Sequence, residues 1–459
     1  MAQENEITHG FDADELLELL DSKQYSEFMH RVDELNPIDV AEFFMELPEE
    51  RQPAVFRLLK KDTAAEIFAE LDGDVQAHLI TGMTDREVRV MLDELYVDDA
   101  VDMLSDIPSN VVKRLLMAAT PETRAELNRF LSYPEGSAGS VMTAEFIELR
   151  KAMTRDEAVE TIRRTGRDKE TIYVCYVTDA RRHLEGIVQL QDLLFAAPDA
   201  TLEEIMDTNI VSAMTHDDRE SVADTISKYD LLALPVVDKE GRLVGIVTVD
   251  DAIDVILEEA GEDLEKMAAM SPTDKPYLRA SVFDTFKKRI PWLLLLMLSA
   301  TFTGAIIARY EEALGMLTIL TAFMPMLMGT GGNAGSQSSI AVIRALSLGE
   351  IELRDVWRVV FKEFRVSLIC GVVMGVATFA KVFVLDLWCD TTKLDVAFVV
   401  SISLVLTVVL AKLIGAVLPL LAKKIKLDPA VMASPFITTI VDALSLVLYF
   451  EVASAVLGI

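Results

Sequence analysis

The chain has 459 residues, 51% of them hydrophobic, and a formal net charge of −31 at pH 7. Residues 1–286 hold 28 basic and 62 acidic side chains (net −34), whereas residues 287–459 hold 15 and 12 (net +3). The strong negative charge of residues 1–286 excludes nucleic acid as a partner, and anionic membrane surfaces repel this part of the chain. Three scattered cysteines and five histidines do not supply a disulfide framework, a zinc site or a catalytic constellation, so we expect no enzyme.

Residues 1–138 are acidic and repetitive, and they predict an all-α superhelical N-terminal domain. The stretches AEFFMEL (41–47), AEIFAEL (65–71) and RVMLDEL (89–95) recur every 24 residues, each at the end of an amphipathic helix. A further unit follows at 100–107, and the array ends near 132–139. A short helical period is typical of an α-solenoid, whose units bury their faces on each other. An ordinary helical bundle with chance similarity is the alternative.

Residues 139–263 change to a β-rich α/β pattern in two copies. The first copy has a helix at 158–166 and strands near 173–179 and 183–189, and the second copy covers 221–256. In the second copy two strands flank the turn KEGR, where Gly241 supplies the tight bend. The sequence LPVVD followed by a G-x-(V/I)-(V/I)-x-x-x-D pattern resembles a tandem CBS domain pair.

Adenine nucleotides are candidate ligands that this resemblance implies. Thr248 and Asp251 stand where a ribose-contacting T-x-x-D is expected, whereas the first copy has QLQD (189–192) and lacks the hydroxyl. ATP is therefore a candidate cofactor of the second copy. The alternative is a module that serves dimerisation and ion sensing alone.

An acid-rich helix is predicted over residues 250–263. Asp251, Asp254, Glu258 and Glu262 follow one stripe at helical spacing. Like charges one turn apart disfavour an isolated helix, and a solvated acidic face is the alternative reading. Because this helix lies between an acidic domain and an apolar one, we favour a binding site for hard cations such as Mg2+.

Residues 264–289 predict a linker and an amphipathic connecting helix that starts at Pro276 and stops at the bilayer surface at 287–289 (KKR). The N-terminal segment lacks a basic stretch followed by an apolar core, so no secretory signal is expected. The positive-inside rule places the preceding domains in the cytosol of a plasma-membrane protein, the inner membrane of a bacterial cell.

Residues 290–459 predict a helical transmembrane domain of five spans. The spans are expected at 290–309, 314–343, 364–385, 396–421 and 430–457. Loops 309–312 and 388–395 hold few basic residues and are expected outside, whereas the link 344–365 and residues 423–426 are basic and are expected inside. An odd number of spans then places the C-terminus outside.

Asp442 is a lone carboxylate within the apolar run 430–457. Placing a charged carboxylate at the centre of a membrane helix costs roughly 2.5–3.5 kcal/mol on insertion scales, so such residues usually face a partner or a water-filled path. We therefore expect a cation pathway at Asp442. The alternative is an aspartate near one end of a tilted helix, hydrogen-bonded to Thr438 or Thr439.

The second span contains an unusual glycine-rich stretch, GTGGNAG (329–335), preceded by Pro325. We expect these residues to interrupt the helix, as is tolerated in membranes only where backbone lines protein or water. Asn333 and Gln337 are four residues apart, on one face, and are expected to hydrogen-bond to ion-bound water. A close-packing seam through Gly331 and Gly335 is the alternative, and both can hold.

The order of these parts resembles the MgtE family of magnesium channels. The matching motifs are PMLMGTGGNAGSQ (325–337) and DPA…SPFITTIVD (428–442), and Ser445 departs from them because a glycine is expected there. The resemblance implies a homodimer with one central pore lined by the second and fifth spans, in which Asp442 of each subunit contacts hydrated Mg2+. Thr438, Asn333, Gln337, Gly331 and Gly335 complete the expected pore set.

The resemblance also implies that cytosolic Mg2+ binds the acidic domains and closes the channel. The implied Mg2+-binding positions are Glu66, Asp98, Asp102, Glu220, Asp230, Asp251, Asp254, Glu259, Glu262, Asp263 and Asp428. No Walker motif occurs in the sequence, so flux is expected to follow the electrochemical gradient. The alternatives are a transporter of another divalent ion such as Co2+ or Mn2+, and a membrane ion or nucleotide sensor that transports nothing.

Overall fold

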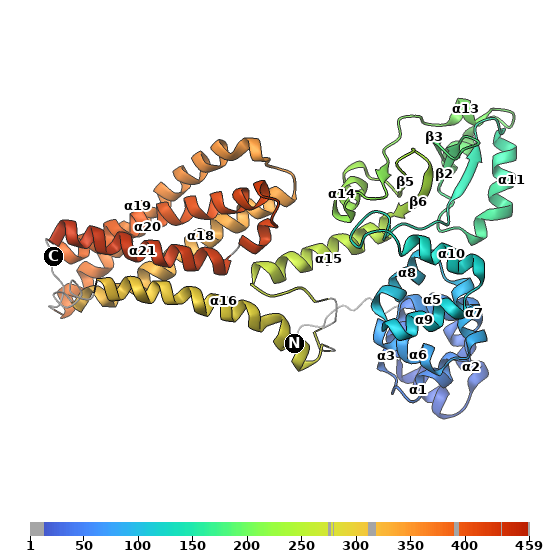
Figure 1. Cartoon of the computed structure of the whole chain (residues 1–459), viewed down its shortest axis with the longest axis horizontal. Helices are drawn as coiled ribbons and strands as arrows, with labels where there is room; N and C mark the ends of the chain where they lie inside the picture. The colour runs from blue at the N-terminus through green and yellow to red at the C-terminus, as the bar shows by residue number, and fades with distance from the viewer. Residues whose placement is uncertain are drawn as a thin grey trace. The chain divides into compact units, whose positions relative to one another are not determined.

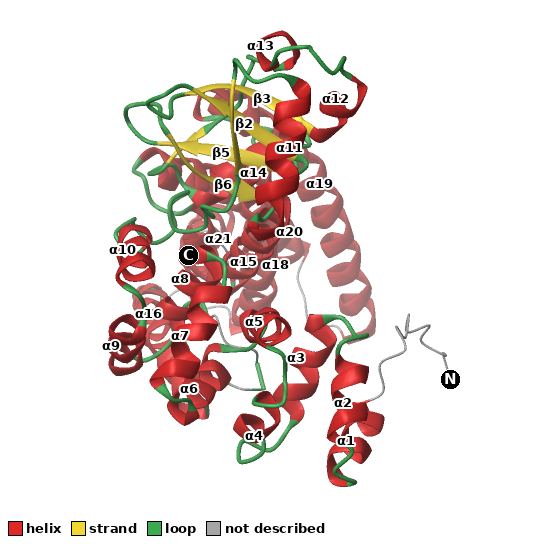
Figure 2. Ribbon diagram, turned by 90° about the vertical axis from the view of Figure 1, so that its right-hand side faces the viewer, coloured by secondary structure: helices red, strands yellow, loops and turns green. Residues whose placement is uncertain are grey.

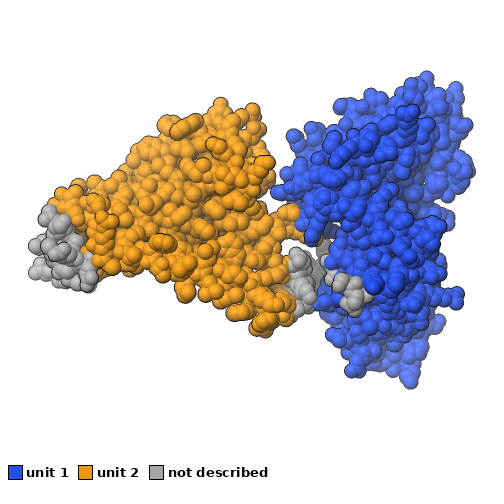
Figure 3. Space-filling model, in the orientation of Figure 1, with its two compact units in different colours: residues 1–256 blue, residues 257–459 orange. Residues whose placement is uncertain are grey.

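The computed structural model describes residues 13–273, 277–278, 280–310, 318–389, 394–432 and 434–457. The chain divides into two compact units, residues 1–256 and 257–459, which Figure 3 shows in different colours. One helix, α15 (Val249–Met267), runs across the boundary between them. The predicted acidic helix 250–263 is therefore confirmed and is longer than expected.

The first part of unit 1 is a stack of short helices, drawn in blue to cyan in Figure 1. After the pair α1 and α2, which pack on each other, helices pack on the next but one: α3 on α5, α5 on α7, α7 on α9, and likewise α4 on α6, α6 on α8 and α8 on α10. The predicted all-α N-terminal domain is confirmed, and its superhelical arrangement stays a prediction. The bounds are α1 (Ala13–Asp21), α2 (Tyr25–Val32), α3 (Pro37–Glu46), α4 (Gln52–Phe56), α5 (Lys61–Ala69), α6 (Gly73–Gly82), α7 (Asp85–Glu94), α8 (Val97–Asp106), α9 (Ser109–Ala118) and α10 (Pro121–Phe130).

Phenylalanines at a spacing of 12 residues hold successive helices of this stack together. The rings of Phe44, Phe56 and Phe68 are buried and meet edge-to-face, with centroids 5.9 Å apart in each pair. Edge-to-face contacts add to the free energy gained by burying the rings. Local caps fix where the helices begin, as at α7, where Thr84 and Glu87 form a capping box.

The second part of unit 1 contains two three-stranded sheets, drawn in yellow in Figure 2. The sheets are β1-β2-β3 and β4-β5-β6, and in each the first pair is parallel and the second antiparallel. The elements are β1 (Ile147–Arg150), α11 (Arg155–Thr165), β2 (Val174–Thr178), β3 (Leu184–Gln189), α12 (Leu190–Phe195), α13 (Leu202–Ile205), β4 (Ala213–Met214), α14 (Arg219–Tyr229), β5 (Ala233–Val237) and β6 (Leu243–Thr248).

The predicted tandem α/β pair is confirmed, and each copy holds one strand more than expected. The strands β1 and β4 are only four and two residues long, too short for a period of two to stand out in the sequence. Gly241 has a φ of +78°, as the predicted turn requires. Residues from both copies, among them Phe146, Tyr176 and Ile246, share one buried core.

Unit 2 is a helical bundle beyond the end of α15. Its helices are α16 (Val282–Arg309), α18 (Met324–Ser347), α19 (Val356–Cys389), α20 (Leu394–Lys424) and α21 (Ser434–Leu457), with a 3-10 turn at Thr318–Phe323. Helix α18 packs against α20 and α21, α19 packs on α20, and α16 packs on α21. Large apolar side chains such as Leu293, Leu298, Val373 and Val376 remain exposed, as expected of surfaces that face lipid.

Among the described residues, four helices are long and apolar enough to cross a membrane: Val282–Arg309, Leu353–Val384, Leu394–Lys424 and Pro429–Leu457. These correspond to four of the five expected spans. The remaining span, 314–343, corresponds to α18, whose glycines, serines and amides make it less apolar, and its first residues lie outside the described ones. The expected outside loops also fall partly on residues 311–317 and 390–393, which are not described.

Two expectations about these helices are wrong. The connecting helix does not stop at residues 287–289, because α16 begins after the cap residue Ser281 and continues through Pro291 to Arg309; its expected start, Pro276, is not described. The glycine stretch does not break the second span, because α18 is continuous with Pro325 in its first turn, where no amide hydrogen bond is lost. The basic link 344–365 is mostly helical, since α18 extends to Ser347 and α19 starts at Val356.

Candidate functional site: an ion pathway and acidic clusters

Asp442, the carboxylate expected in the ion pathway, lies in the first half of α21. Its Oδ1 is buried and has no hydrogen-bond partner in the described part of the chain. The hydroxyl of Thr439 donates to the carbonyl oxygen of Pro435 at 3.0 Å, so it does not cap Asp442. A buried carboxylate oxygen without a donor is costly, which favours a partner from outside this chain, such as water, an ion or a second subunit.

Asn333 and Gln337 are both exposed, one turn apart on α18. Amide side chains on a membrane helix require a polar environment or another protein surface. The structure therefore leaves these two residues on a face that the described part of the chain does not cover. Their expected contact with ion-bound water stays a prediction.

Gly331 and Gly335, in contrast, lie buried where α18 meets α20 and α21. A Cβ at Gly331 would lie 2.7 Å from Cγ2 of Thr407, and one at Gly335 would lie 2.7 Å from Cγ2 of Ile437. The tightest contact between α18 and α20 is at Gly415, because a Cβ added to this residue of α20 would lie 2.2 Å from the carbonyl oxygen of Gly335. These glycines form the packing seam that was the alternative reading.

Two other members of the expected motifs belong to the same seam. Thr438 places its Cγ2 2.9 Å from the position of a Cβ at Gly332. Ser445, where the family pattern led us to expect a glycine, is 1% exposed, and its Oγ lies 3.0 Å from the position of a Cβ at Gly331. The serine is therefore accommodated between helices, beside the glycine of the facing helix.

Unit 1 contains a cluster of carboxylates that face one another. Besides burial, the neighbours that raise the pKa values of Asp98, Asp99 and Glu170 are other carboxylates, so like charges dominate the cluster. Its members are Glu70, Asp98, Asp99, Glu145, Glu170, Asp250, Asp251 and Asp254. The first three come from the helical stack and the others from the α/β pair and α15. We refer to this set as the unit 1 acidic cluster.

Burial and mutual repulsion both shift the titration of this cluster. Burial, then Asp251 and Asp250, raises the pKa of Glu170 to about 7. Burial, then Asp251, raises the pKa of Asp99 to about 6. Asp98 is 9% exposed, and burial followed by Asp99 raises its pKa well above its ordinary value. Desolvation and like charge both disfavour the ionised form, and a bound cation would relieve both.

The structure brings together some of the expected Mg2+ positions and leaves others apart. Asp98, Asp251 and Asp254 belong to the unit 1 acidic cluster. Glu66 lies close to this cluster, since the pKa of Tyr96 is raised by burial and then by the charges of Glu170, Glu145, Asp99 and Glu66. Asp230 is instead the left-handed C-cap of α14, with φ 52°. Glu220 lies in the first turn of α14, and Asp102 is exposed on α8. In the described ranges, no three Asp, Glu, His or Cys side chains converge closely enough to hold a metal.

A second acidic group lies in unit 2, where Lys266 joins α15 to the segment before α21. Its Nζ lies 2.7 Å from Oε2 of Glu262 and 2.8 Å from Oδ2 of Asp428. Burial, then Asp428, raises the pKa of the neighbouring Asp263. The sequence predicted the carboxylates Glu262, Asp263 and Asp428 here, with Glu259 one turn earlier on α15. It did not predict that Lys266 lies between them. The position of Lys266, four residues after Glu262 on a helix, is the sequence signal that could have revealed this ion pair.

The residues expected to contact a nucleotide are bonded to each other. The hydroxyl of Thr248 donates to Oδ2 of Asp251 at 2.5 Å, just before α15 begins. In the first copy, the side chain of Asp192 accepts from the backbone nitrogen of Gln189 at 3.3 Å. The two copies therefore share a carboxylate cap, and only the second adds a hydroxyl.

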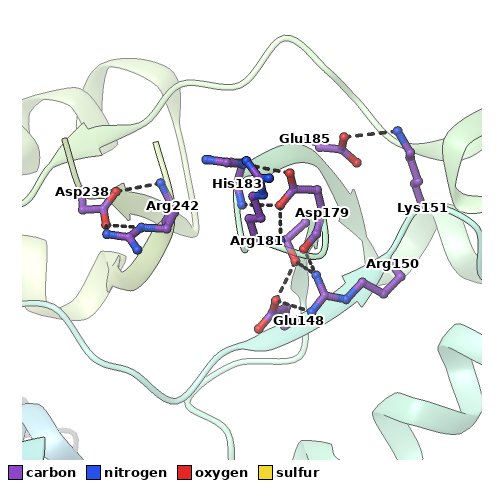
Figure 4. A network of polar contacts seen from close by, with 10 residues as sticks. Glu148, Arg150, Lys151, Asp179, Arg181, His183, Glu185, Asp238 and Arg242 are labelled. Atoms are coloured by element: carbon purple, nitrogen blue, oxygen red, sulfur yellow. Dashed lines mark hydrogen bonds and ion pairs between the residues drawn. The ribbon is translucent and has the colours of Figure 1, made fainter. Parts of the chain in front are cut away.

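Several other charged residues of the α/β pair form ion pairs, as Figure 4 shows. Nδ1 of His183 lies 2.8 Å from Oδ2 of Asp179, and this contact, with backbone donors, lowers the pKa of Asp179 to about 2. Nε of Arg242 lies 2.7 Å from Oδ2 of Asp238 at the equivalent turn of the second copy. The hairpin turns thus pair their charges with opposite ones, whereas like charges raise the pKa values within the unit 1 acidic cluster.

Comparison with known proteins decides the family. The profile described as a divalent cation transporter matches residues 324–452, the MgtE intracellular N domain matches 35–136, and a CBS domain matches 202–258. The magnesium transporter MgtE of Thermus thermophilus is 37% identical over 429 residues, which cover 93% of this chain and 94% of that protein. The chain belongs to the MgtE family of magnesium transporters.

Further MgtE proteins and solved structures agree with this assignment. The magnesium transporter MgtE of Bacillus subtilis is 33% identical over 437 residues, which cover 95% of this chain and 95% of that protein. The soluble part of a magnesium transporter matches with a TM-score of 0.52 at 33% identity, covering 54% of this chain and all but 2% of that one. The cytosolic domain of the Mg2+ channel MgtE in complex with ATP matches with a TM-score of 0.51 at 38% identity over 53% of this chain and all of that one. The N-terminal part of this membrane transporter is therefore cytosolic, and the chain is no enzyme.

Proposed function

We propose that this MgtE-family chain is a Mg2+-selective channel that imports Mg2+ down its electrochemical gradient and is closed by cytosolic Mg2+. The observation that carries this proposal is the buried, unpartnered Oδ1 of Asp442 on a membrane helix. A carboxylate so placed lowers the barrier to a cation, and a hard oxygen ligand favours Mg2+ over a softer metal. A membrane potential of 100 mV, negative inside, contributes about 4.6 kcal/mol per divalent ion.

The pore is proposed to form in a homodimer, with α18 and α21 of both subunits around one axis and five spans in each subunit. The exposed face of Asn333 and Gln337 supports this arrangement, because a second copy would cover it and leave a water-filled path. Two Asp442 carboxylates then hold a hydrated Mg2+ through its water shell, which this ion sheds reluctantly. The glycine seam supports the pore from behind by allowing α18 to pack closely on its neighbours.

Closure is proposed to follow from neutralisation of the acidic groups. In the division that we propose, residues 1–138 form the helical domain, 139–263 the CBS pair, 264–289 the linker and connecting helix, and 290–459 the pore domain. At low Mg2+ the like charges of the unit 1 acidic cluster repel one another, and Mg2+ would compensate them and favour a compact state. The carboxylates on α15 and Asp428 would sense Mg2+ in the same way near the pore helix.

ATP is proposed as a ligand of the second CBS copy. The support is the ATP complex of a similar cytosolic domain and the pairing of Thr248 with Asp251, which are the residue types that contact a ribose. The missing hydroxyl in the first copy predicts one nucleotide for each chain.

Mg2+ flux into proteoliposomes tests the proposal, with wild type compared to Asp442→Ala and cytosolic Mg2+ varied. Glu451→Gln is the matched control, because Glu451 is a second carboxylate on α21 that already accepts a hydrogen bond from Tyr310 at 2.8 Å. We expect flux to require Asp442, to survive in the control and to fall as cytosolic Mg2+ rises. If Asp442→Ala carries as much flux as the wild type, the pore assignment is refuted. A preference for Co2+ or Mn2+ over Mg2+ would favour a transporter of another divalent ion. No flux from folded wild-type protein would favour a membrane sensor that transports nothing.

A further inference from the structure

Lys412 is a buried lysine in the middle of a membrane-spanning helix. It lies on α20, is 6% exposed, and has no role in the proposed pore. An ammonium group at membrane depth is as costly as a carboxylate and requires a partner. Its presence therefore calls for a specific compensating group.

The side chain of Lys412 contacts a hydroxyl that is in turn bonded to a carboxylate. Nζ of Lys412 donates to Oγ of Ser338 on α18 at 3.4 Å, and this hydroxyl donates to Oε2 of Glu363 on α19 at 2.6 Å. A serine hydroxyl accepts and donates at once, so one neutral group satisfies both ions. Opposite charges linked through a polarised hydroxyl in a low-dielectric interior stabilise each other more than in water.

A comparison with Lys423, on the same helix, shows how far Lys412 lies from the end of α20. Its Nζ lies 3.4 Å from the carbonyl oxygen of Leu346, close to the ends of both α20 and α18. Lys412 lies 11 residues earlier, about 16 Å along the helix axis at about 1.5 Å per residue. The hydrocarbon core is about 30 Å thick, so Lys412 lies roughly half a bilayer from that end.

We infer that Lys412 and Glu363 form an ion pair, relayed by Ser338, that positions the pore face of α18. Ser338 is 2% exposed and directly follows Gln337, whose side chain lies on the exposed face. Because Ser338 on α18 is bonded both to α19 and to α20, these bonds restrict the rotation of α18 about its own axis. Lys412, Ser338 and Glu363 are thus positioning residues for Gln337. This inference rests on the proposed function only for its transport readout.

Thermal unfolding of the detergent-solubilised full chain tests the ion pair without any transport. Removing one partner leaves an uncompensated charge, so Lys412→Met and Glu363→Gln should each lower the midpoint by about 10 °C. The double variant should recover most of that loss, because both charges are then gone. Lys423→Met is the matched control and should change the midpoint by no more than about 2 °C. Additive losses in the double variant would overturn the pair.

Mg2+ flux per folded channel then tests the positioning role. Gln337→Ala and Lys412→Met should each raise the half-saturating Mg2+ concentration, and together they should raise it no further, because both act through the same side chain. The double variant Lys412→Met/Glu363→Gln should return within about threefold of wild type. Independent, multiplicative effects of Gln337→Ala and Lys412→Met would overturn positioning. Absence of flux in wild type would count against the proposed function and leave the thermal result standing.

Discussion

Lys266 and Asp428 are joined by an ion pair of 2.8 Å between Nζ and Oδ2, and the same Nζ lies 2.7 Å from Oε2 of Glu262. Although burial opposes it, these bonds raise the pKa of Lys266, so the ammonium stays charged. Two carboxylates therefore converge on one positive charge between the end of α15 and the start of α21. A divalent ion that bridged the same carboxylates would have to displace the lysine.

Replacing Lys266 should make closure more sensitive to Mg2+. In Lys266→Gln the carboxylates lose their resident cation, so the cytosolic Mg2+ concentration for half-inhibition of flux should fall by about fivefold, equivalent to roughly 1 kcal/mol of coupling. Lys239→Gln, which removes the same charge from an exposed hairpin turn, should leave this concentration unchanged. An unchanged or higher concentration in Lys266→Gln would contradict the competition.

The seam between α18 and α20 should not tolerate a methyl group. Gly415→Ala would place Cβ 2.2 Å from the carbonyl oxygen of Gly335, so the helices must separate, and we expect a loss of about 1–3 kcal/mol in the free energy of unfolding. Gly329→Ala on α18 meets no atom within 4 Å and should be neutral or stabilise by up to about 1 kcal/mol. Denaturant titration of the solubilised protein compares the two. Equal stability of both variants would show that the seam is not tight.

Unit 1 should lose stability as pH rises in the absence of Mg2+. The folded state raises the pKa of Glu170 to about 7 and that of Asp99 to about 6, whereas carboxyls of an unfolded chain titrate near about 4. Between these values the folded state binds more protons, so the free energy of unfolding falls as pH rises through about 4 to 7. Thermal unfolding of unit 1 in a chelator should show a higher midpoint at pH 5.5 than at pH 8.

A matched pair of variants separates this effect from a general response to pH. Glu170→Gln should reduce the difference between the two midpoints, because one of the raised pKa values is removed. Glu160→Gln changes a carboxylate on the exposed surface of α11, beside Arg163, and should leave the difference unchanged. A midpoint that rises with pH in the wild type would refute the electrostatic account.

Nucleotide binding should depend on the second copy of the CBS pair alone. Thr248→Val removes the hydroxyl that pairs with Asp251, and ATP affinity should fall by about tenfold in calorimetric titration of the full chain. Gln189→Ala alters the equivalent position of the first copy and should not change affinity. Equal losses in both variants would mean that ATP does not choose between the copies.

Periodic features of the sequence predicted much of this fold. The 24-residue repeat located the helical stack, because each repeat buries the same face, and the turn at Gly241 located a hairpin. The short strands β1 and β4 were not predictable, since two to four residues carry no period and their pairing with β2 and β5 is a tertiary contact. The glycines of α18 were misleading, because their low helix propensity is outweighed by packing on α20 and α21 that only the structure shows.

The candidate site was predictable where a single residue contradicts its surroundings. Asp442 stands out because a carboxylate interrupts an apolar run, and Lys412 could have been found by the same test, since it interrupts the apolar run of α20. Glu70, Glu145 and Glu170 were not predictable, because nothing local distinguishes them from the many other acids of unit 1. They join Asp98 and Asp251 only through the tertiary packing of the helical stack and the α/β pair.

The stack of helices α3–α10 bears on how this protein reaches its membrane. Each helix touches partners close in sequence, and such low contact order permits folding in microseconds to milliseconds. Synthesis at about 5–20 residues per second is far slower, so the stack can fold while the chain is still growing. The first membrane helix, α16, begins at Val282, well after these residues. The helical stack can therefore be compact when the first apolar helix leaves the ribosome, and a folded, highly charged body that cannot be threaded across a bilayer would help to fix the orientation of every span that follows.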